Sequence, residues 1–112
     1  MRGLSSRLTG MLNREPWRAV ATTRYNKRRK KLAPEVRRRL NEVQADILQD
    51  PYRGEQKRGA LKNVRVVKLP AQNDQYLVAY EIEDADHTVV FLDIGQHENF
   101  YRDLEKHVRA TE

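Results

Sequence analysis

The sequence contains no cysteine, and this absence narrows the chemistry open to the protein. Without a thiol the chain forms no disulfide, offers no thiolate to a metal and has no cysteine nucleophile. Long apolar runs are also missing: none approaches the roughly 20 residues that cross a bilayer. Residues 1–13 lack the apolar segment of roughly 7 residues that a secretory signal requires. We therefore expect a cytoplasmic protein with no membrane partner.

Motifs for metal and nucleotide chemistry are missing as well. His87, His97 and His107 do not have the spacing of metal ligands, and there is no HExxH or paired-carboxylate signature. The sequence also has no glycine-rich nucleotide loop and no GxSxG nucleophile motif. We expect neither a metal nor an organic cofactor.

Positive charge is unevenly distributed in this chain of 112 residues. Residues 1–80 carry nineteen Lys and Arg against seven Asp and Glu, whereas residues 81–112 carry three against nine. A basic excess on a small domain is typical of a protein that binds a polyanion, although a solvated basic surface gives the same count. The 38% of hydrophobic residues suffice for one core, which indicates a single domain.

The hydrophobic pattern predicts the order of the elements. We expect a strand at 17–22, helices at 23–32 and 34–49, strands at 63–69, 75–82 and 88–94, and a helix at 98–108. This order predicts an α+β fold, in which a helical hairpin and a C-terminal helix pack on one face of a mainly antiparallel four-stranded sheet. The domain would comprise residues 16–112, with residues 1–15 as an N-terminal extension.

The second helix has the clearest signals. Pro34 suits the first helical turn, and Asp50-Pro51 marks the end of the helix. Between them apolar residues recur at helical spacing and form one stripe: Val36, Leu40, Val43, Ile47 and Leu48.

Basic side chains gather in two sets. The first belongs to the helical hairpin, where Lys/Arg residues serve either solubility or contact with the phosphate backbone of a nucleic acid; the candidate residues for that contact are Lys27, Arg28, Lys31 and Arg38. The second consists of Arg58, Lys62, Arg65 and Lys68, in and before the strand 63–69. Arg65 and Lys68 fall on opposite faces of that strand, but both parities include apolar residues. Parity therefore leaves open which of the two faces outward.

A histidine stands where the strand 88–94 gives way to the last helix. His97 follows Gly95-Gln96, and its imidazole is suited to carrying a proton near neutral pH. A histidine at the start of a helix also serves as a capping or packing residue. Both roles remain open from the residues alone.

Several of these segments together resemble toxins of the RelE/ParE superfamily from type II toxin–antitoxin systems. The resemblance covers about residues 17–108 and rests on motifs in the right order: Leu48-Gln49-Asp50-Pro51, Gly59-Ala60-Leu61-Lys62, Val64-Arg65-Val66-Val67-Lys68-Leu69, Tyr76-Leu77-Val78-Ala79-Tyr80, Ile94-Gly95-Gln96-His97 and Tyr101-Arg102. The chain is more similar to the RelE branch, whose members inhibit translation.

For a RelE-like toxin, the resemblance implies metal-independent cleavage of mRNA on the ribosome, with the ribose 2′-OH attacking the adjacent phosphate. Carried over by position, it implies catalytic roles for Lys68, His97 and Tyr101. Leu77 stands where the family usually has a catalytic arginine, so one anion-stabilising donor is missing. An acidic antitoxin, the ribosome and mRNA are the implied partners, and the residues of the two basic sets other than Lys68 become candidate RNA-binding residues. Two alternatives remain: a ParE-like toxin that inhibits DNA gyrase, and a module that binds an antitoxin or RNA with little or no catalysis.

Overall fold

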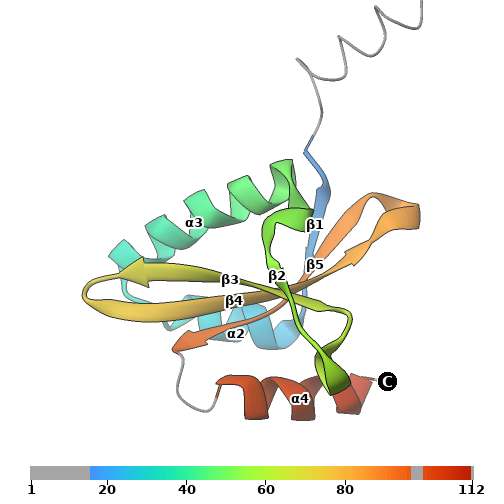
Figure 1. Ribbon diagram of the computed structural model, residues 1–112. Helices are drawn as coiled ribbons and strands as arrows, with labels where there is room; N and C mark the ends of the chain where they lie inside the picture. The colour runs from blue at the N-terminus through green and yellow to red at the C-terminus, as the bar shows by residue number, and fades with distance from the viewer. Residues whose placement is uncertain (1–15, 97–99, 112) are drawn as a thin grey trace, which may run out of the picture.

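Three helices and five strands make up the described part of the chain. The computed structural model describes residues 16–96 and 100–111, with side chains as far as residue 108. His97 and the proposed extension 1–15 lie outside these residues. The elements in chain order are β1 (Arg18–Ala21), α2 (Thr23–Lys30), α3 (Pro34–Gln49), the 3-10 turn η1 (Pro51–Arg53), β2 (Glu55–Gln56), η2 (Gly59–Leu61), β3 (Val64–Ala71), β4 (Asp74–Glu83), η3 (Asp84–Asp86), β5 (Thr88–Gln96) and α4 (Phe100–Thr111) (Figure 1).

The sheet has the strand order β1-β5-β4-β3-β2. Only the β1–β5 pair is parallel, so the expected mainly antiparallel α+β fold is confirmed. The expected number of four strands is wrong, because Glu55 and Gln56 pair with Val66 and Arg65 and add a fifth strand at the edge. Two residues are too short to show an alternating pattern, and the flanking glycines are typical of a loop.

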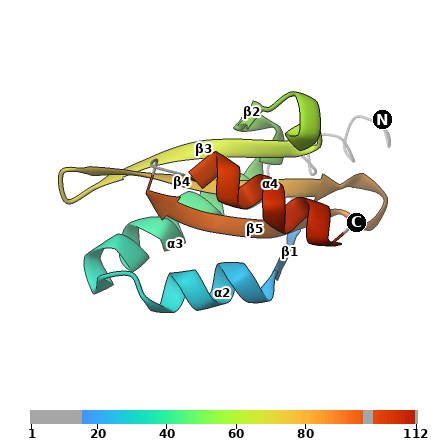
Figure 2. The ribbon, with the colours of Figure 1, turned by 90° about the horizontal axis from the view of Figure 1, so that it is seen from below.

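Both faces of the sheet are covered, which corrects the prediction that the helices share one face. Val78 and Tyr80 of β4 belong to the core under α2 and α3, whereas Leu77 and Ala79 belong to the core under α4. Figure 1 shows α3 above the strands and α4 below them, and Figure 2 shows α4 crossing in front of the sheet. The physical reason is that all four residues are buried and apolar. A strand that is apolar on both faces needs a cover on each.

The helical hairpin forms as its sequence signals predict. Helix α3 spans the expected residues 34–49, begins at Pro34 and buries three residues of its apolar stripe, Val36, Leu40 and Ile47. Thr22 caps α2, because its hydroxyl accepts the Tyr25 N–H at 3.1 Å. The same hydroxyl donates to the Leu92 carbonyl of β5 at 3.0 Å, which fixes the start of α2 against the sheet.

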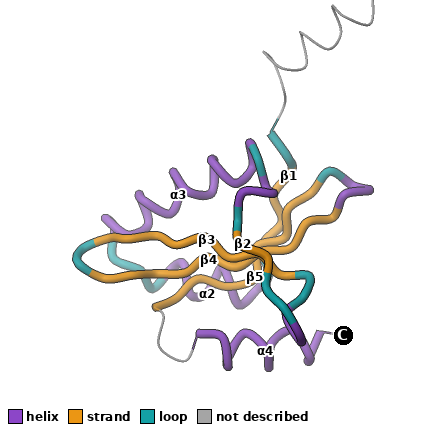
Figure 3. Tube along the Cα trace, viewed as in Figure 1, coloured by secondary structure: helices purple, strands orange, loops and turns teal. Residues whose placement is uncertain are grey.

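A two-residue turn joins β3 and β4 at the end of a long hairpin. Figure 3 draws the two strands in orange and the turn in teal. Gln72 and Asn73 both have positive φ, 52° and 66°, as the tight turns that suit twisted hairpins require. The strands are therefore longer than expected, and Pro70 pairs with Gln75 inside β3. Proline is tolerated there because β2 ends before this point and leaves the other side of Pro70 without a neighbouring strand.

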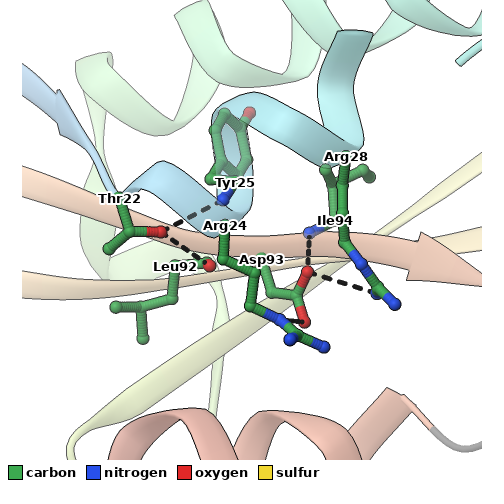
Figure 4. Close-up of polar contacts among 7 residues, drawn as sticks. All are labelled: Thr22, Arg24, Tyr25, Arg28, Leu92, Asp93 and Ile94. Carbon is green, nitrogen blue, oxygen red and sulfur yellow. Dashed lines mark hydrogen bonds and ion pairs between the residues drawn. The ribbon is translucent and has the colours of Figure 1, made fainter. Parts of the chain in front are cut away.

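A buried carboxylate ties α2 to β5. Asp93 is fully buried and accepts hydrogen bonds from Arg24 Nε at 2.9 Å and Arg28 Nη1 at 3.3 Å (Figure 4). The Ile94 N–H also donates to the Asp93 carboxylate at 2.8 Å. A buried charge is tolerated only when it is paired in this way. Among the described helices none is long and apolar enough to cross a membrane.

Candidate functional site

A hollow of about 370 Å³ lies where the β3–β4 pair, the start of α4 and the η1–β2 segment meet. We call it the Lys68 hollow. It is lined by Arg53, Gly54, Glu55, Val66, Val67, Lys68, Leu77 and Tyr101. Two of the three residues with expected catalytic roles, Lys68 and Tyr101, are therefore brought together although 33 positions separate them in the sequence.

The structure shows which cation of β3 is exposed to solvent. Lys68 is exposed, and it lies across from Leu77 on the α4 side of the sheet. No hydrogen bond or ion pair among the described residues engages its ammonium group. Arg65 is half-buried and points to the other face, opposite Tyr80. Lys68 is thus the β3 cation that is available to a ligand.

Tyr101 is held at the rim of the hollow by contacts on two sides. Its ring meets Phe100 edge to face, with centroids 5.4 Å apart. The Lys57 ammonium lies 4.9 Å from the centre of the Tyr101 ring, within the range of a cation–π interaction. Because Phe100 is buried in the core under α4, the tyrosine is fixed relative to the sheet.

Glu55 and Lys57 form an ion pair beside these groups, with 2.8 Å between the carboxylate oxygen and Nζ. The hydrogen bond from Lys57 lowers the pKa of Glu55, and the positive charge of Lys68 contributes in the same direction. The pKa of Lys57 is raised chiefly by the hydrogen bond to Glu55, against the effect of burial, and Tyr101 adds to the rise. Both groups are therefore charged at neutral pH, and Lys57 balances Glu55.

The seven residues expected to bind RNA lie elsewhere. Arg65 donates to the backbone carbonyls of Tyr52 and Gly54, so its guanidinium serves the fold. Arg58 and Lys62 are exposed at the two ends of η2 and do not line the Lys68 hollow. Their contact with RNA stays a prediction.

The hairpin cations are divided between two settings. Arg28 is tied to Asp93 and, with Lys31, lines a second hollow of about 510 Å³ that also includes Tyr76 and Gln96. Lys27 and Arg38 are exposed on the helices, where Arg38 pairs with Glu35. These residues are accessible to a polyanion, but they stand on different elements from Lys68 and Tyr101.

Sequence reasoning missed three residues around the site, namely Arg53, Glu55 and Lys57. Their signal was the basic character of the loop 51–61, but a loop without periodicity gives no indication of which side chains converge. His97 lies outside the described residues. No group of His, Asp and Glu within residues 16–96 and 100–111 is arranged to hold a metal ion.

Several solved structures with the same fold are toxins or toxin–antitoxin complexes. An E. coli RelE toxin with two arginines replaced by alanine, in the free state, has 18% identity and a TM-score of 0.70, over 87% of this chain and 98% of its own. The intact E. coli RelBE complex contains a chain with 22% identity and a TM-score of 0.64, over 73% of this chain and 98% of that one. The RelBE2 complex of Mycobacterium tuberculosis contains a chain with 24% identity and a TM-score of 0.64. The match covers 76% of this chain and 95% of that one. These likenesses establish the RelE-like fold.

The family follows from the sequence match. No curated protein matches the chain, but the model of a family described as the ParE-like toxin of type II bacterial toxin–antitoxin systems matches residues 19–105. This range includes every described residue of the Lys68 hollow. The resemblance to the RelE/ParE superfamily is thereby confirmed, and the chain belongs to the family of ParE-like toxins of type II bacterial toxin–antitoxin systems.

Proposed function

We propose that this toxin is a ribosome-dependent mRNA endoribonuclease that inhibits translation without a metal cofactor. The observation that carries the proposal is the convergence of Lys68 and Tyr101 on one hollow, in which the Lys68 ammonium makes no hydrogen bond or ion pair among the described residues. A toxin that acted only by binding gyrase would not need a free cation and a tyrosine in a shared concave site.

The arrangement suits attack by a ribose 2′-OH on the adjacent phosphate. In this reaction the bond from O2′ to phosphorus forms and the bond from phosphorus to O5′ breaks. The 2′-OH loses its proton, and the leaving O5′ gains one. Negative charge builds up on the phosphate oxygens, where a fixed ammonium group stabilises it. We assign this role to Lys68 and a proton-carrying or charge-stabilising role to His97. Tyr101 would orient the substrate or contribute its hydroxyl.

An acidic antitoxin is the partner we propose for the resting state. The chain has a pI of about 9.8, which favours an acidic partner that masks the cationic surface. The fold neighbours from E. coli and M. tuberculosis are toxin–antitoxin complexes, which supports the same partner. The test is purification of the chain at low salt when it is expressed from its own operon. Recovery without a bound acidic protein would count against the proposal.

The test of the activity is expression in cells, followed by mapping of mRNA 5′ ends and of DNA breaks. Purified ribosomes programmed with a defined mRNA then give rates. We expect Lys68→Ala and His97→Ala each to slow cleavage by about 10²-fold or more, as loss of an anion donor or a proton carrier does elsewhere. Arg18→Gln is the charge control, because Arg18 lies on β1 at the opposite edge of the sheet.

Two outcomes would change the proposal. If His97→Asn keeps full activity while Lys68→Ala does not, His97 caps the helix, since asparagine caps well. If both variants stay fully toxic and cells show DNA breaks with intact mRNA, the function is gyrase inhibition. Tyr101→Phe separates the roles of the ring and the hydroxyl: a mild effect indicates packing, and a large effect indicates participation of the hydroxyl.

A further inference from the structure

We infer that Arg53 is a further phosphate-binding residue of the Lys68 hollow, and that it supplies from the η1 turn the positive charge that Leu77 does not supply from β4. The inference rests on the proposed function in one respect, namely that the hollow receives an RNA phosphate. Its basis is the way in which the fold holds and presents Arg53.

The charged residues around the hollow include a second cation that can donate hydrogen bonds to a phosphate. Arg53 and Lys68 are the cations that line it, and Glu55 is the acid among its described lining residues. Because Glu55 is already paired with Lys57, its charge is largely balanced, and the hollow keeps the net positive charge of Arg53 and Lys68. Leu77 contributes only an apolar side chain to the floor.

The backbone on both sides of Arg53 is fixed by a buried tyrosine. The Tyr80 hydroxyl donates to the Pro51 carbonyl at 2.6 Å and accepts the Gly54 N–H at 3.1 Å. Tyr80 is fully buried in the core under α2 and α3. The Tyr80 hydroxyl thus holds the backbone in place two residues before Arg53 and one residue after it.

A second side chain of the sheet binds the same turn. Arg65 Nη1 donates to the carbonyls of Tyr52 and Gly54, the residues that flank Arg53, at 3.1 and 2.9 Å. The Arg65 guanidinium also lies 5.3 Å from the centre of the Tyr52 ring. Arg65, which the sequence suggested for contact with RNA, therefore acts as a positioning residue for Arg53.

Glycine at position 54 is required by this close approach. A Cβ there would lie 2.4 Å from the Tyr80 hydroxyl oxygen and 3.2 Å from Cβ of Arg65. The backbone at the end of the η1 turn therefore packs directly against side chains of the sheet, which restrain its position. Rigid support of this kind places a donor before the substrate arrives and lowers the cost of binding.

Arg53 itself takes no part in that support through its side chain. It is exposed, and its guanidinium makes no hydrogen bond or ion pair among the described residues. A guanidinium has five N–H donors in a planar fork that matches two phosphate oxygens. A free guanidinium on a rigid turn, beside a free ammonium in a hollow, is what recognition of a phosphodiester requires.

The experiment measures binding of a single-stranded RNA trinucleotide with 2′-O-methyl groups, which cannot be cleaved, to the full chain at several salt concentrations. We expect Arg53→Gln to weaken binding about tenfold and to reduce the slope of log K against log salt by about 1, as the loss of one phosphate contact does. Arg53→Lys should give an intermediate affinity, because lysine keeps the charge and loses the fork. Arg18→Gln removes the same charge at the far edge and should change affinity less than twofold.

The inference is overturned if Arg53→Gln and Arg18→Gln weaken binding equally, or if the wild-type chain does not bind the trinucleotide at low salt. Thermal unfolding of each variant checks that the fold is intact. The proposed nuclease fails separately: if wild-type protein leaves mRNA on ribosomes uncut but Arg53→Gln still weakens trinucleotide binding selectively, the phosphate site stands and the catalytic proposal does not.

Discussion

Lys68 of β3 and Leu77 of β4 are direct cross-strand partners, and both line the same hollow. The position where the family usually has an arginine is therefore beside the lysine that we assign to the phosphate. Because cross-strand neighbours on one face have Cβ atoms about 5 Å apart, an arginine at position 77 would reach the same ligand as Lys68. Its absence is a change in the site itself and not in a distant part of the fold.

Leu77→Arg should therefore increase the rate of ribosome-dependent cleavage, by up to about 10²-fold, the usual contribution of one fixed anion donor. The same change should restore much of the trinucleotide binding that Arg53→Gln removes. Leu77 is buried, so some stability will be lost even though the long side chain can extend toward the open hollow. Rates are compared per folded molecule, with Leu77→Gln as the uncharged control. Equal rates for the arginine and glutamine variants would contradict the prediction.

Tyr80→Phe should lower RNA binding and cleavage although Tyr80 belongs to the core on the face away from α4. The change removes the hydroxyl that holds Pro51 and Gly54, and leaves their buried polar groups unpaired at a cost of about 1–3 kcal/mol. The matched control is Tyr25→Phe, which loses a 2.7 Å hydrogen bond to Gln44 elsewhere in the same core. Both variants should unfold at lower temperature. Only Tyr80→Phe should also weaken binding of the trinucleotide.

Asp93→Ala should be among the most destabilising single changes in the described part of the chain. Two arginines would lose their partner, and the Ile94 N–H would lose its acceptor. Side chains of Arg24 and Arg28 are 28% and 37% exposed, so they can recover part of their hydration. We expect a loss of about 3 kcal/mol, at the lower end for a broken buried pair.

Chemical denaturation of the Asp93→Ala variant provides the measurement. The control is Glu35→Ala, which breaks the exposed pair with Arg38 and should cost less than about 1 kcal/mol. If the two variants lost the same stability, the Asp93 cluster would have no special role in joining α2 to β5.

The fold was largely predictable because its longer elements carry strong local signals. Helix α3 has an apolar stripe between Pro34 and Asp50-Pro51, and its observed bounds match the prediction. The short strand β2 has no such signal, because its two residues are defined only by pairing with β3. The distribution of helices over both faces also depends on contacts between distant segments, which periodicity within one segment does not specify.

The site was predictable only in part, and for the same reason. Lys68 lies in a patterned strand, and Tyr101 was carried over from the family motif. Arg53, Glu55 and Lys57 stand in a loop whose path depends on Tyr80, 27 positions after Arg53. Parity could not separate Arg65 from Lys68 because apolar residues flank both. The partners of Arg65, the carbonyls of the η1 turn, appear only in three dimensions.

Lys57→Met should reduce cleavage about tenfold, less than loss of Lys68 itself, because it acts through the charge of Glu55. With Lys57 removed, the nearby cation that already lowers the pKa of Glu55 by its charge is Lys68. A carboxylate whose pKa is lowered remains ionised at neutral pH, so it would compete with the RNA phosphate for the Lys68 ammonium. The ring of Tyr101 would also lose its cation contact. Glu55→Gln combined with Lys57→Met removes the competing charge and should recover most of the activity, as measured by rates on programmed ribosomes. If the double variant stayed as slow as Lys57→Met, the loss would come from the displaced Tyr101 ring, and neutralisation of Glu55 would not be the function of Lys57.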